Sequence, residues 1–343
     1  MLAQDIDPRN KRTIRAGYNK PETVTALIEH YVENQLKEKN DQYKTIKSNL
    51  ERSVTPYIGE YEVSKLELAD YIEMFNQEKR RAGAKHSARL LHRLKTVMNY
   101  GVRNGFIKYN TLAPLRVQDV GQSSEPRRMK LQDVEIGAFW ACIGSLAYHP
   151  SIHNLFRLNL IFGNRIGELI LSTKDEFDFE KMVWTVPKTH NKTRNVGGNE
   201  IVRPIPSMAL AFLRDQFALF PEAKHTFPQY YIYKDAPINK KTPYRPSIKL
   251  GEMLVDLGYP DVRNHDMRRT ARNAWEKLGF PFIVSETMLG HKVHKGVHAH
   301  YLDYTYLEEQ RECYEKWCDY IKEMTEKFIV GEKKIVKFKS AVG

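Results

Sequence analysis

Two arginines, two histidines and a tyrosine carry the functional groups that chemistry on a phosphate ester needs. They are Arg165, His265, Arg268, His291 and Tyr301. A guanidinium group holds a phosphate through two parallel N–H donors, an imidazole moves protons or donates hydrogen bonds near neutral pH, and a phenol can attack as a nucleophile. His265 and Arg268 are three residues apart, so they would lie on one face of a helix. The set predicts attack by a tyrosine on a phosphate that the arginines hold.

Four short strings around these residues resemble the motifs of one family. They are GNRIGELIL at 163–171, NHDMRRT at 264–270, MLGH at 288–291 and HYLDYTYLEEQR at 300–311. Their order and spacing resemble the tyrosine recombinases, also called phage integrases, over roughly residues 21–317. Within that family the chain is most similar to integrases of satellite prophages and genomic islands, because a Tyr-Leu-Glu-Glu-x-Arg run follows their nucleophile.

The resemblance implies a role for each residue that binds the phosphate. Arg165 corresponds to the first catalytic arginine, and His265 with Arg268 to the His-x-x-Arg pair of the family. Their guanidinium groups would stabilise the charge that a scissile phosphate gains in its pentacoordinate transition state. His291 corresponds to the second histidine, near the leaving oxygen. Glu168 is expected to orient Arg165 or a neighbour without touching the phosphate itself. The alternative is an acid that only the helix dipole favours.

The resemblance also implies a general acid and a nucleophile. Lys192, in the basic segment KTHNKTR, matches the lysine that protonates the leaving 5′ oxygen, with Lys188 as its alternative. Tyr301 matches the nucleophile. Tyr304 and Tyr306 are its rivals, but the spacing of ten residues from the histidine of the MLGH string favours Tyr301.

The implied reaction is a transesterification of double-stranded DNA that uses no metal or other cofactor. Attack by the tyrosine leaves a 3′-phosphotyrosyl link and a free 5′ hydroxyl, and a 5′ hydroxyl of a partner duplex reseals the strand. A homotetramer would act on two duplexes, with accessory DNA-bending or directionality factors as further partners, to integrate or excise a mobile element. Two alternatives stay open: a non-catalytic DNA-binding or architectural protein with a decayed recombinase domain, and a type IB topoisomerase-like enzyme.

A cluster of histidines offers a competing interpretation of the same stretch. Its spacing, H-x2-H-x3-H-x-H, is compatible with a metal site and involves His291, His294, His298 and His300. Neither a cysteine nor a His-Glu-x-x-His motif joins these residues. We therefore expect no metal site.

The charge of the chain suits a nucleic-acid partner, and its cysteine content suits a reducing compartment. The net charge is +12 and the pI is near 9.3, which suits a polyanion. The three cysteines form no CxxC pair, which fits the reducing cytoplasm, and we expect the protein there in association with the nucleoid. Apolar runs all fall short of the ~20 residues of a membrane span, so we expect no membrane partner.

Composition and periodicity divide the chain into two domains, and the resemblance identifies them. The expected fold is mainly α with a small antiparallel β-sheet: a helical core-binding domain followed by an α+β tyrosine-recombinase catalytic domain, the two clamping DNA. The expected boundaries are 1–20 for an N-terminal arm or linker, 21–115 for the helical core-type DNA-binding domain, 116–130 for a linker, 131–330 for the catalytic domain and 331–343 for a tail strand. Whether an arm-binding domain has been removed ahead of residue 1 stays open.

A row of cations in the first domain falls at helical spacing. Arg81, Lys85, Arg89 and Arg93 follow one another at steps of four, so on a helix they would form a ridge that faces a phosphate backbone. The alternative is an ordinary solvated face. In the second domain we also expect DNA contacts from the basic residues Lys188 and Arg194.

Helices in the second domain alternate with a few short strands. Phe177 to Pro187 has the alternation of a hairpin, and 200–205 that of a third strand. A terminal strand is expected over Lys333 to Phe338. A strand that short cannot stand alone, so it would join the sheet of its own subunit or of a neighbour.

Overall fold

The computed structural model describes residues 20–40, 42–123, 125, 129–190, 200–229, 234–291 and 304–341, with side chains in the last helix as far as Gly331. The chain divides into two compact units, Met1–Pro126 and Arg127–Gly343, and each is described by itself. This division falls inside the stretch 116–130 that we expected to be a linker.

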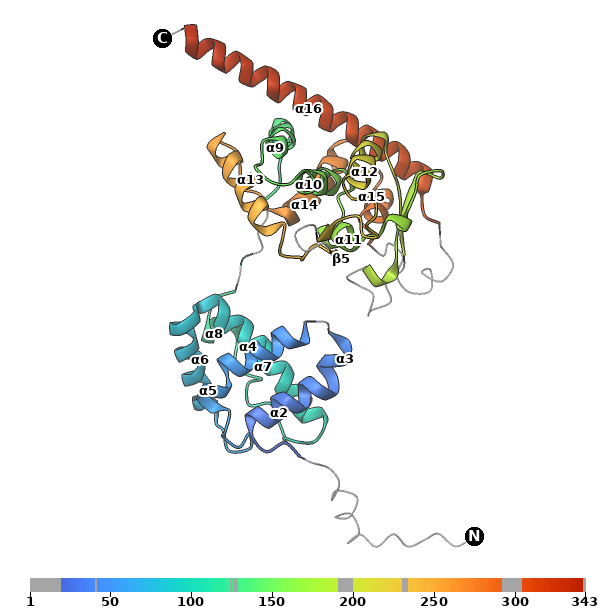
Figure 1. Cartoon of the computed structure of the whole chain (residues 1–343). Helices are drawn as coiled ribbons and strands as arrows, with labels where there is room; N and C mark the ends of the chain where they lie inside the picture. The colour runs from blue at the N-terminus through green and yellow to red at the C-terminus, as the bar shows by residue number, and fades with distance from the viewer. Residues whose placement is uncertain are drawn as a thin grey trace, which may run out of the picture. The chain divides into compact units, whose positions relative to one another are not determined.

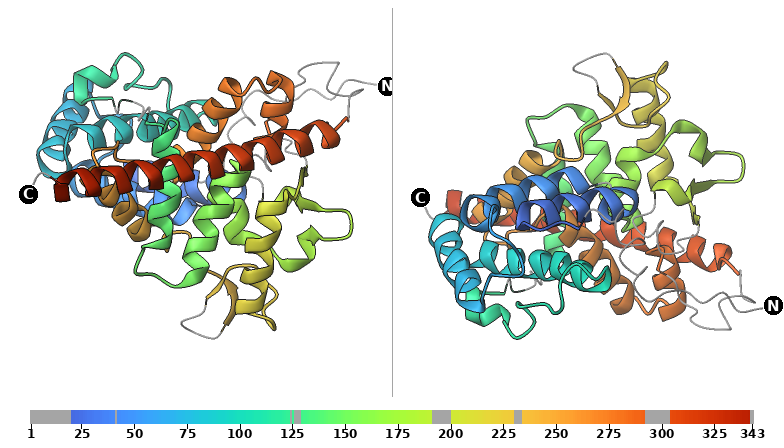
Figure 2. Two further views of the ribbon diagram at one scale, coloured as in Figure 1. Left: turned by 90° about the horizontal axis from the view of Figure 1, so that it is seen from above. Right: turned by 90° about the horizontal axis from the view of Figure 1, so that it is seen from below.

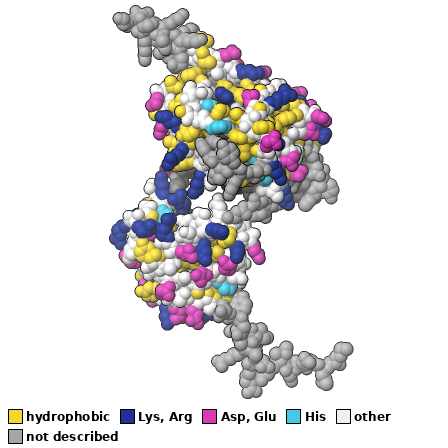
Figure 3. Space-filling view, viewed as in Figure 1, with side chains coloured by type: hydrophobic (Ala, Val, Ile, Leu, Met, Phe, Trp, Pro, Cys, Tyr) yellow, Lys and Arg dark blue, Asp and Glu magenta, His cyan; other side chains and the backbone are white. Residues whose placement is uncertain are grey.

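The first unit consists of helices packed on one apolar core (Figure 1). They are α2 (Val24–Tyr31), η2 (Val32–Leu36), α3 (Lys37–Lys39), α4 (Tyr43–Ser53), α5 (Thr55–Ile58), α6 (Leu68–Ala82), α7 (Ala84–Arg103) and α8 (Val117–Val120). Lys and Arg side chains gather on the surface around α6, α7 and α8 (Figure 3). Helix α8 lies in the expected linker, yet Val120 is buried and Gln122 N donates to Ala84 O at 3.2 Å. The first unit therefore extends past residue 115.

The second unit is mainly helical, as the sequence predicts, and holds two small antiparallel sheets where one was expected. Its helices are α9 (Val134–Gly144), α10 (Pro150–Phe162), α11 (Ile166–Leu171), η3 (Lys174–Glu176), η4 (Lys188–His190), α12 (Ser207–Leu219), α13 (Tyr244–Asp256), α14 (Asn264–Lys277), α15 (Phe282–Met288) and α16 (Leu307–Ala341). One sheet has the order β1-β2-β3, formed by β1 (Phe177–Asp178), β2 (Val183–Val186) and β3 (Ile201–Pro204). The other pairs β4 (Pro228–Gln229) with β5 (Lys234–Pro237), and the sequence did not predict these strands.

Pairing in the first sheet confirms the expected hairpin and third strand. Phe177 stands opposite Trp184, and Trp184 stands opposite Arg203. The side chains of Trp184 and Arg203 are both fully buried. This sheet therefore turns one face, including a charged residue, into the core.

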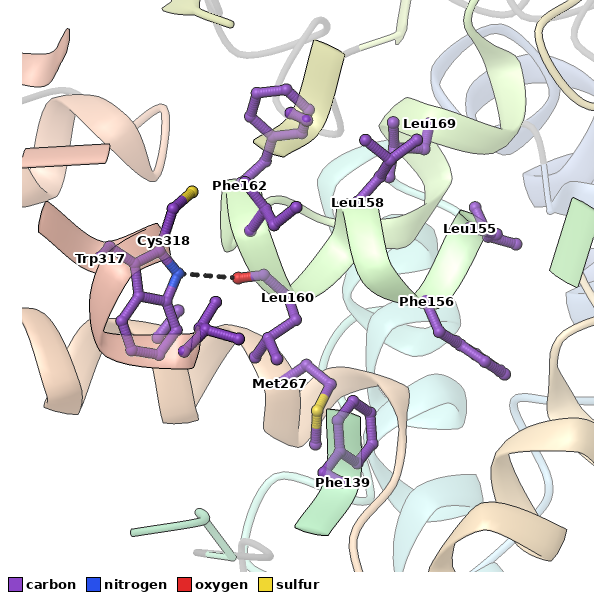
Figure 4. Close-up of a cluster of buried hydrophobic side chains, with 14 of the residues drawn as sticks. Phe139, Leu155, Phe156, Leu158, Leu160, Phe162, Leu169, Met267, Trp317 and Cys318 are labelled. Carbon is purple, nitrogen blue, oxygen red and sulfur yellow. Dashed lines mark hydrogen bonds between the residues drawn. The ribbon is translucent and has the colours of Figure 1, made fainter. Parts of the chain in front are cut away.

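Helix α10 is the centre of the second core, and α16 closes its C-terminal end (Figure 4). Trp317 Nε1 donates to Leu160 O at 3.2 Å, and the Tyr314 hydroxyl donates to Phe162 O at 3.2 Å. The last carbonyl groups of a helix have no partners within it, so these two bonds from α16 satisfy α10 where it ends. The turn that follows, 163–165, is held in place by the same contacts.

The C-terminal segment corrects one expectation. Helix α16 continues to Ala341, so the strand expected over Lys333–Phe338 is wrong. These six residues mix lysines with Ile335, Val336 and Phe338, a composition that fits a strand. A helix that is already formed, however, gains one hydrogen bond for each residue it adds. Figure 1 and the left view of Figure 2 show α16 as one long rod, and in Figure 1 its last turns run past the other helices of this unit.

Among the residues described, no helix is both long enough and apolar enough to cross a membrane.

Gly137 tests the packing of α9 on α16. A Cβ atom at Gly137 would come within 2.1 Å of the backbone oxygen of Met324 in α16, so Gly137→Ala should push the helices apart. Overpacking of this kind costs about 1–3 kcal/mol, so we expect the melting temperature to fall by roughly 3–10 °C in calorimetry.

Gly144, in the same helix, provides the control. The nearest atom to a Cβ there is 3.5 Å away, on the flexible side chain of Arg157, so Gly144→Ala should leave stability unchanged or raise it by up to about 1 kcal/mol. Equal effects of the two substitutions would contradict the close approach.

Candidate active site

Arg165 stands at the start of α11, directly after a turn that only glycine allows. Gly163 has a left-handed φ of 57°, and a Cβ there would lie 2.7 Å from the ring of Trp275. Arg165 is the N-cap residue of α11, and its Nη1 lies 3.4 Å from Oε1 of Glu168 in the first turn. The expected contact between the two residues is therefore present.

Glu168 is buried and shared with a second arginine. Its Oε2 lies 3.0 Å from Nη2 of Arg203 on β3, and both side chains are almost completely inaccessible. We did not single out Arg203 from the sequence. The signal was there, because a period of two places Arg203 on the same strand face as Ile201 and Ile205, which are apolar and buried. A cation on a buried face requires an acidic partner.

Arg268 joins the two turns that carry the other site residues. From α14, its Nη1 donates to Gly163 O at 3.2 Å and its Nη2 donates to Leu289 O at 2.8 Å. Burial, and secondly the charge of Arg165, lower its pKa to about 10, so it is still protonated at neutral pH. Two guanidinium groups that repel each other inside the protein form a site where an anion is favoured.

The second histidine is held in a defined tautomer. His291 Nε2 lies 2.8 Å from Arg268 Nη2, and its Nδ1 lies 2.6 Å from Oε2 of Glu286. Because arginine only donates, Nε2 accepts, and the proton sits on Nδ1 and is donated to Glu286. Gly290, which precedes it, has a φ of 69° and no room for a Cβ beside Ile201.

Glu286 is a residue that sequence reasoning missed. Burial by itself would raise the pKa of its carboxyl, but hydrogen bonds from His291 and Arg272 outweigh burial and hold the pKa below its usual range. Arg272 Nε donates to Glu286 Oε1 at 2.9 Å. The carboxylate thus stays ionised and fixes the ring of His291. No sequence motif pointed to it.

Of the other expected site residues in the second unit, the structure describes His265 and Lys188. His265 lies one turn before Arg268 on α14 and is exposed. Lys188 is exposed in η4. Lys192, Arg194 and Tyr301 lie outside the described residues, as do His294, His298 and His300. The described part of the site therefore brings together Arg165, Glu168, Arg268 and His291.

Tyr304, one of the rivals for nucleophile, is described. Its hydroxyl donates to Glu309 at 3.2 Å, and the negative charge of Glu309 is the first cause that raises the pKa of this phenol. A raised pKa makes the phenolate harder to form. This environment does not suit a nucleophile.

A second buried acid lies under the end of β2. Glu176 accepts a hydrogen bond from Trp184 Nε1 at 3.1 Å, and its Oε1 lies 2.9 Å from Nδ1 of His190. Burial raises the pKa of Glu176 to about 7, and burial also lowers the pKa of His190. The pair holds η4, which carries Lys188, against the sheet.

The cations of the expected ridge in the first unit differ in their partners. Arg81 is ion-paired with the buried Glu78, and its Nε donates to Oε2 of that residue at 2.8 Å. Arg89 and Arg93 instead line a small pocket of about 130 Å³ together with Asn49, His86 and Leu90. The expected single ridge is wrong, because Arg81 lies at the end of α6 while Lys85, Arg89 and Arg93 lie on α7. Lys85 is exposed, so the charge available to a ligand comes from these three residues of α7.

The chain is similar to known integrases over almost its whole length. The family model described as "Phage integrase central domain" matches residues 24–118. The chain is 24% identical over 330 residues to the prophage integrase IntA of Escherichia coli (strain K12), which covers 94% of this chain and 76% of that protein. It is 23% identical over 345 residues to the integrase of Enterobacteria phage P4, covering 96% and 76%.

Solved structures share the fold. A lambda integrase tetramer bound to a Holliday junction aligns with a TM-score of 0.62 at 14% identity, over 87% of this chain and 85% of that one. The integrase of transposon Tn1549 in complex with circular intermediate DNA aligns with a TM-score of 0.61 at 16% identity, over 82% and 98%.

Glu176 should make the stability of the protein fall as the pH rises. Its pKa is raised from 4.5 to about 7, so the folded state holds a proton that the unfolded state releases in this window, and stability falls as pH rises through it. The contribution is at most about 3 kcal/mol. His190, whose pKa is lowered, opposes this trend, so wild type must be compared with Glu176→Gln.

Between pH 4.5 and pH 7.5 we expect the wild-type melting temperature to fall relative to that of Glu176→Gln by roughly 5 °C. Melting curves at several pH values measure this difference. Parallel curves for the two proteins would show that Glu176 does not titrate in this range.

Proposed function

The chain belongs to the tyrosine recombinase (phage integrase) family, and on that premise we propose that it is a site-specific recombinase that cuts and rejoins double-stranded DNA through a 3′-phosphotyrosyl intermediate. The observation that carries the proposal is the pair of guanidinium groups of Arg165 and Arg268, with His291 bonded to the second. Burial, and after it the charge of Arg165, lowers the pKa of Arg268. An anion bound between the two groups would relieve their repulsion.

The scissile phosphate of DNA supplies this anion, and its negative charge grows as it reacts. In the pentacoordinate transition state the phosphoryl oxygens gain negative charge, so fixed guanidinium donors bind that state better than the ground state. Because Arg268 is bonded to the carbonyl groups of Gly163 and Leu289, its position does not have to change during the reaction. This preorganisation is the main catalytic contribution of the described residues.

Each residue of the site has a distinct role in the proposed step. The hydroxyl oxygen of Tyr301 attacks phosphorus, the bond to the 5′ oxygen breaks, and Lys192 gives that oxygen a proton. His265 accepts the proton of the Tyr301 hydroxyl as its oxygen attacks, and His291 lies beside Arg268, near the leaving oxygen. In the reverse step a 5′ hydroxyl attacks the phosphotyrosine and releases Tyr301.

Exchange of strands between duplexes requires more than one active site. We propose that four copies assemble on two duplexes and that the reaction integrates or excises a mobile element. The lambda integrase similar in fold is a tetramer bound to a Holliday junction, which supports this assembly. Accessory DNA-bending or directionality factors would choose the direction.

Replacing Tyr301 by phenylalanine tests the nucleophile. A nicked suicide substrate should trap a covalent protein–DNA adduct with wild type, also in EDTA, because arginines rather than a metal ion meet the phosphate charge. Tyr301→Phe should bind the same DNA and form no adduct in denaturing gels.

Tyr304→Phe is the matched control and should form the adduct at the wild-type rate. An adduct with Tyr301→Phe but none with Tyr304→Phe would move the nucleophile to Tyr304. A wild-type protein that binds DNA yet never forms an adduct would favour the non-catalytic alternative.

Arg89 and Arg93 test the role of the first unit. Replacing both by alanine should weaken DNA binding and reduce the slope of log K against log salt by about one unit for each phosphate that the protein no longer neutralises. Cleavage of DNA that is already bound should keep its rate. Binding isotherms at several salt concentrations measure the slope.

Lys37→Ala with Lys65→Ala makes a control of equal charge. These exposed lysines pair with Glu33 and Glu62. The control should leave the slope near that of wild type. A slope that the Arg89 and Arg93 substitutions do not change would mean that their pocket faces solvent in the complex.

A further inference from the structure

Arg203 is a fully buried cation that the proposed chemistry does not use. Its side chain has 0% exposure. Its Nε donates to Met288 O at 2.9 Å, its Nη2 lies 3.0 Å from Glu168 Oε2, and its guanidinium carbon lies 5.2 Å from the centre of the Trp184 ring. These partners belong to α15, α11 and β2.

A buried ion pair is a poor way to stabilise a protein. Removing two charges from water costs several kcal/mol per ion, and apolar residues of similar volume often fill the same space without reducing stability. The pair of Arg203 with Glu168 is therefore better explained by geometry than by stability. Both of its polar partners lead directly to the active site.

The two partners lead to different parts of the phosphate site. Glu168 also contacts Arg165, whose Nη1 lies 3.4 Å from Oε1 of the same carboxylate. Met288 immediately precedes Leu289, whose carbonyl accepts from Arg268, and the turn that ends at His291. Arg203 is thus bonded to the segment of the first arginine and to the segment of the second histidine.

We propose that Arg203 is a positioning residue for DNA cleavage, acting through Glu168 and through the turn that carries His291. The inference rests on the proposed function. With Arg203 in place, Glu168 shares its charge between two arginines, and Arg165 is left with a long, weak contact that frees its donors for the phosphate. Without Arg203, the full charge of Glu168 would fall on Arg165 and draw it away from the substrate.

If Arg203 acts through Glu168, single and double substitutions of the two residues should differ in a defined way. Arg203→Met should slow single-turnover cleavage by about 10–100-fold, since displacement of catalytic groups reduces rates by this much, while the Kd for a single site stays within about threefold of wild type. Arg203→Lys restores a cation opposite Glu168 and should recover part of the rate. Glu168→Gln in the Arg203→Met background removes the unpaired carboxylate, so the double variant should be no slower than Arg203→Met alone.

A role in folding alone would give a different result. Melting curves of all four variants, with Glu168→Gln as the fourth, accompany the kinetics, and if Arg203→Met fails to fold, the double variant and Arg203→Lys carry the test. Cleavage by folded Arg203→Met at the wild-type rate, or rate reductions that multiply in the double variant, would overturn the inference. If wild type itself forms no adduct, the proposed function fails instead.

Discussion

The active site depends on one buried guanidinium group that is bonded to the backbone at two places. Arg268 donates to Gly163 O and to Leu289 O, so one side chain of α14 fixes the turn before α11 and the turn after α15. Both turns contain a glycine in a left-handed conformation where a side chain would collide with Trp275 or Ile201. A side chain at either glycine would displace its turn, so both glycines help to keep these carbonyl groups within reach of Arg268.

Behind this contact, the helical core supplies rigidity. Helix α10 leads into the Arg165 turn, and its free terminal carbonyl groups are satisfied by Trp317 and Tyr314 of α16. Helix α16, which follows the proposed nucleophile Tyr301 in sequence, therefore also holds the end of α10 that leads to Arg165. The position of α16 and the geometry of the phosphate site are thus physically linked within one unit.

The charged groups around Arg268 are arranged so that a bound anionic substrate would balance its positive charge. Glu168 compensates Arg203 and part of Arg165, and Glu286 compensates Arg272 and fixes His291. Arg268 bonds to carbonyl oxygens and to a neutral imidazole, which leaves its charge uncompensated among these contacts. A phosphate diester has the charge and the acceptor geometry that such a group needs.

The sequence by itself determined the residue types and the local elements of this site, because helix periodicity and glycine turns depend on neighbouring residues. Arg165 after a glycine turn, the spacing of His265 and Arg268, and the Phe177–Pro187 hairpin are of this kind. Local patterns misled at Lys333–Phe338, where six residues fit a strand and a helix equally well. Only the tertiary structure decided that Arg203 meets Met288 and that Glu286 fixes His291. The first of these contacts spans 85 residues, so the adjacent sequence cannot set it. The second joins residues that are five apart, but Glu286 is also held by Arg272 from another helix, and only the fold brings that helix to it.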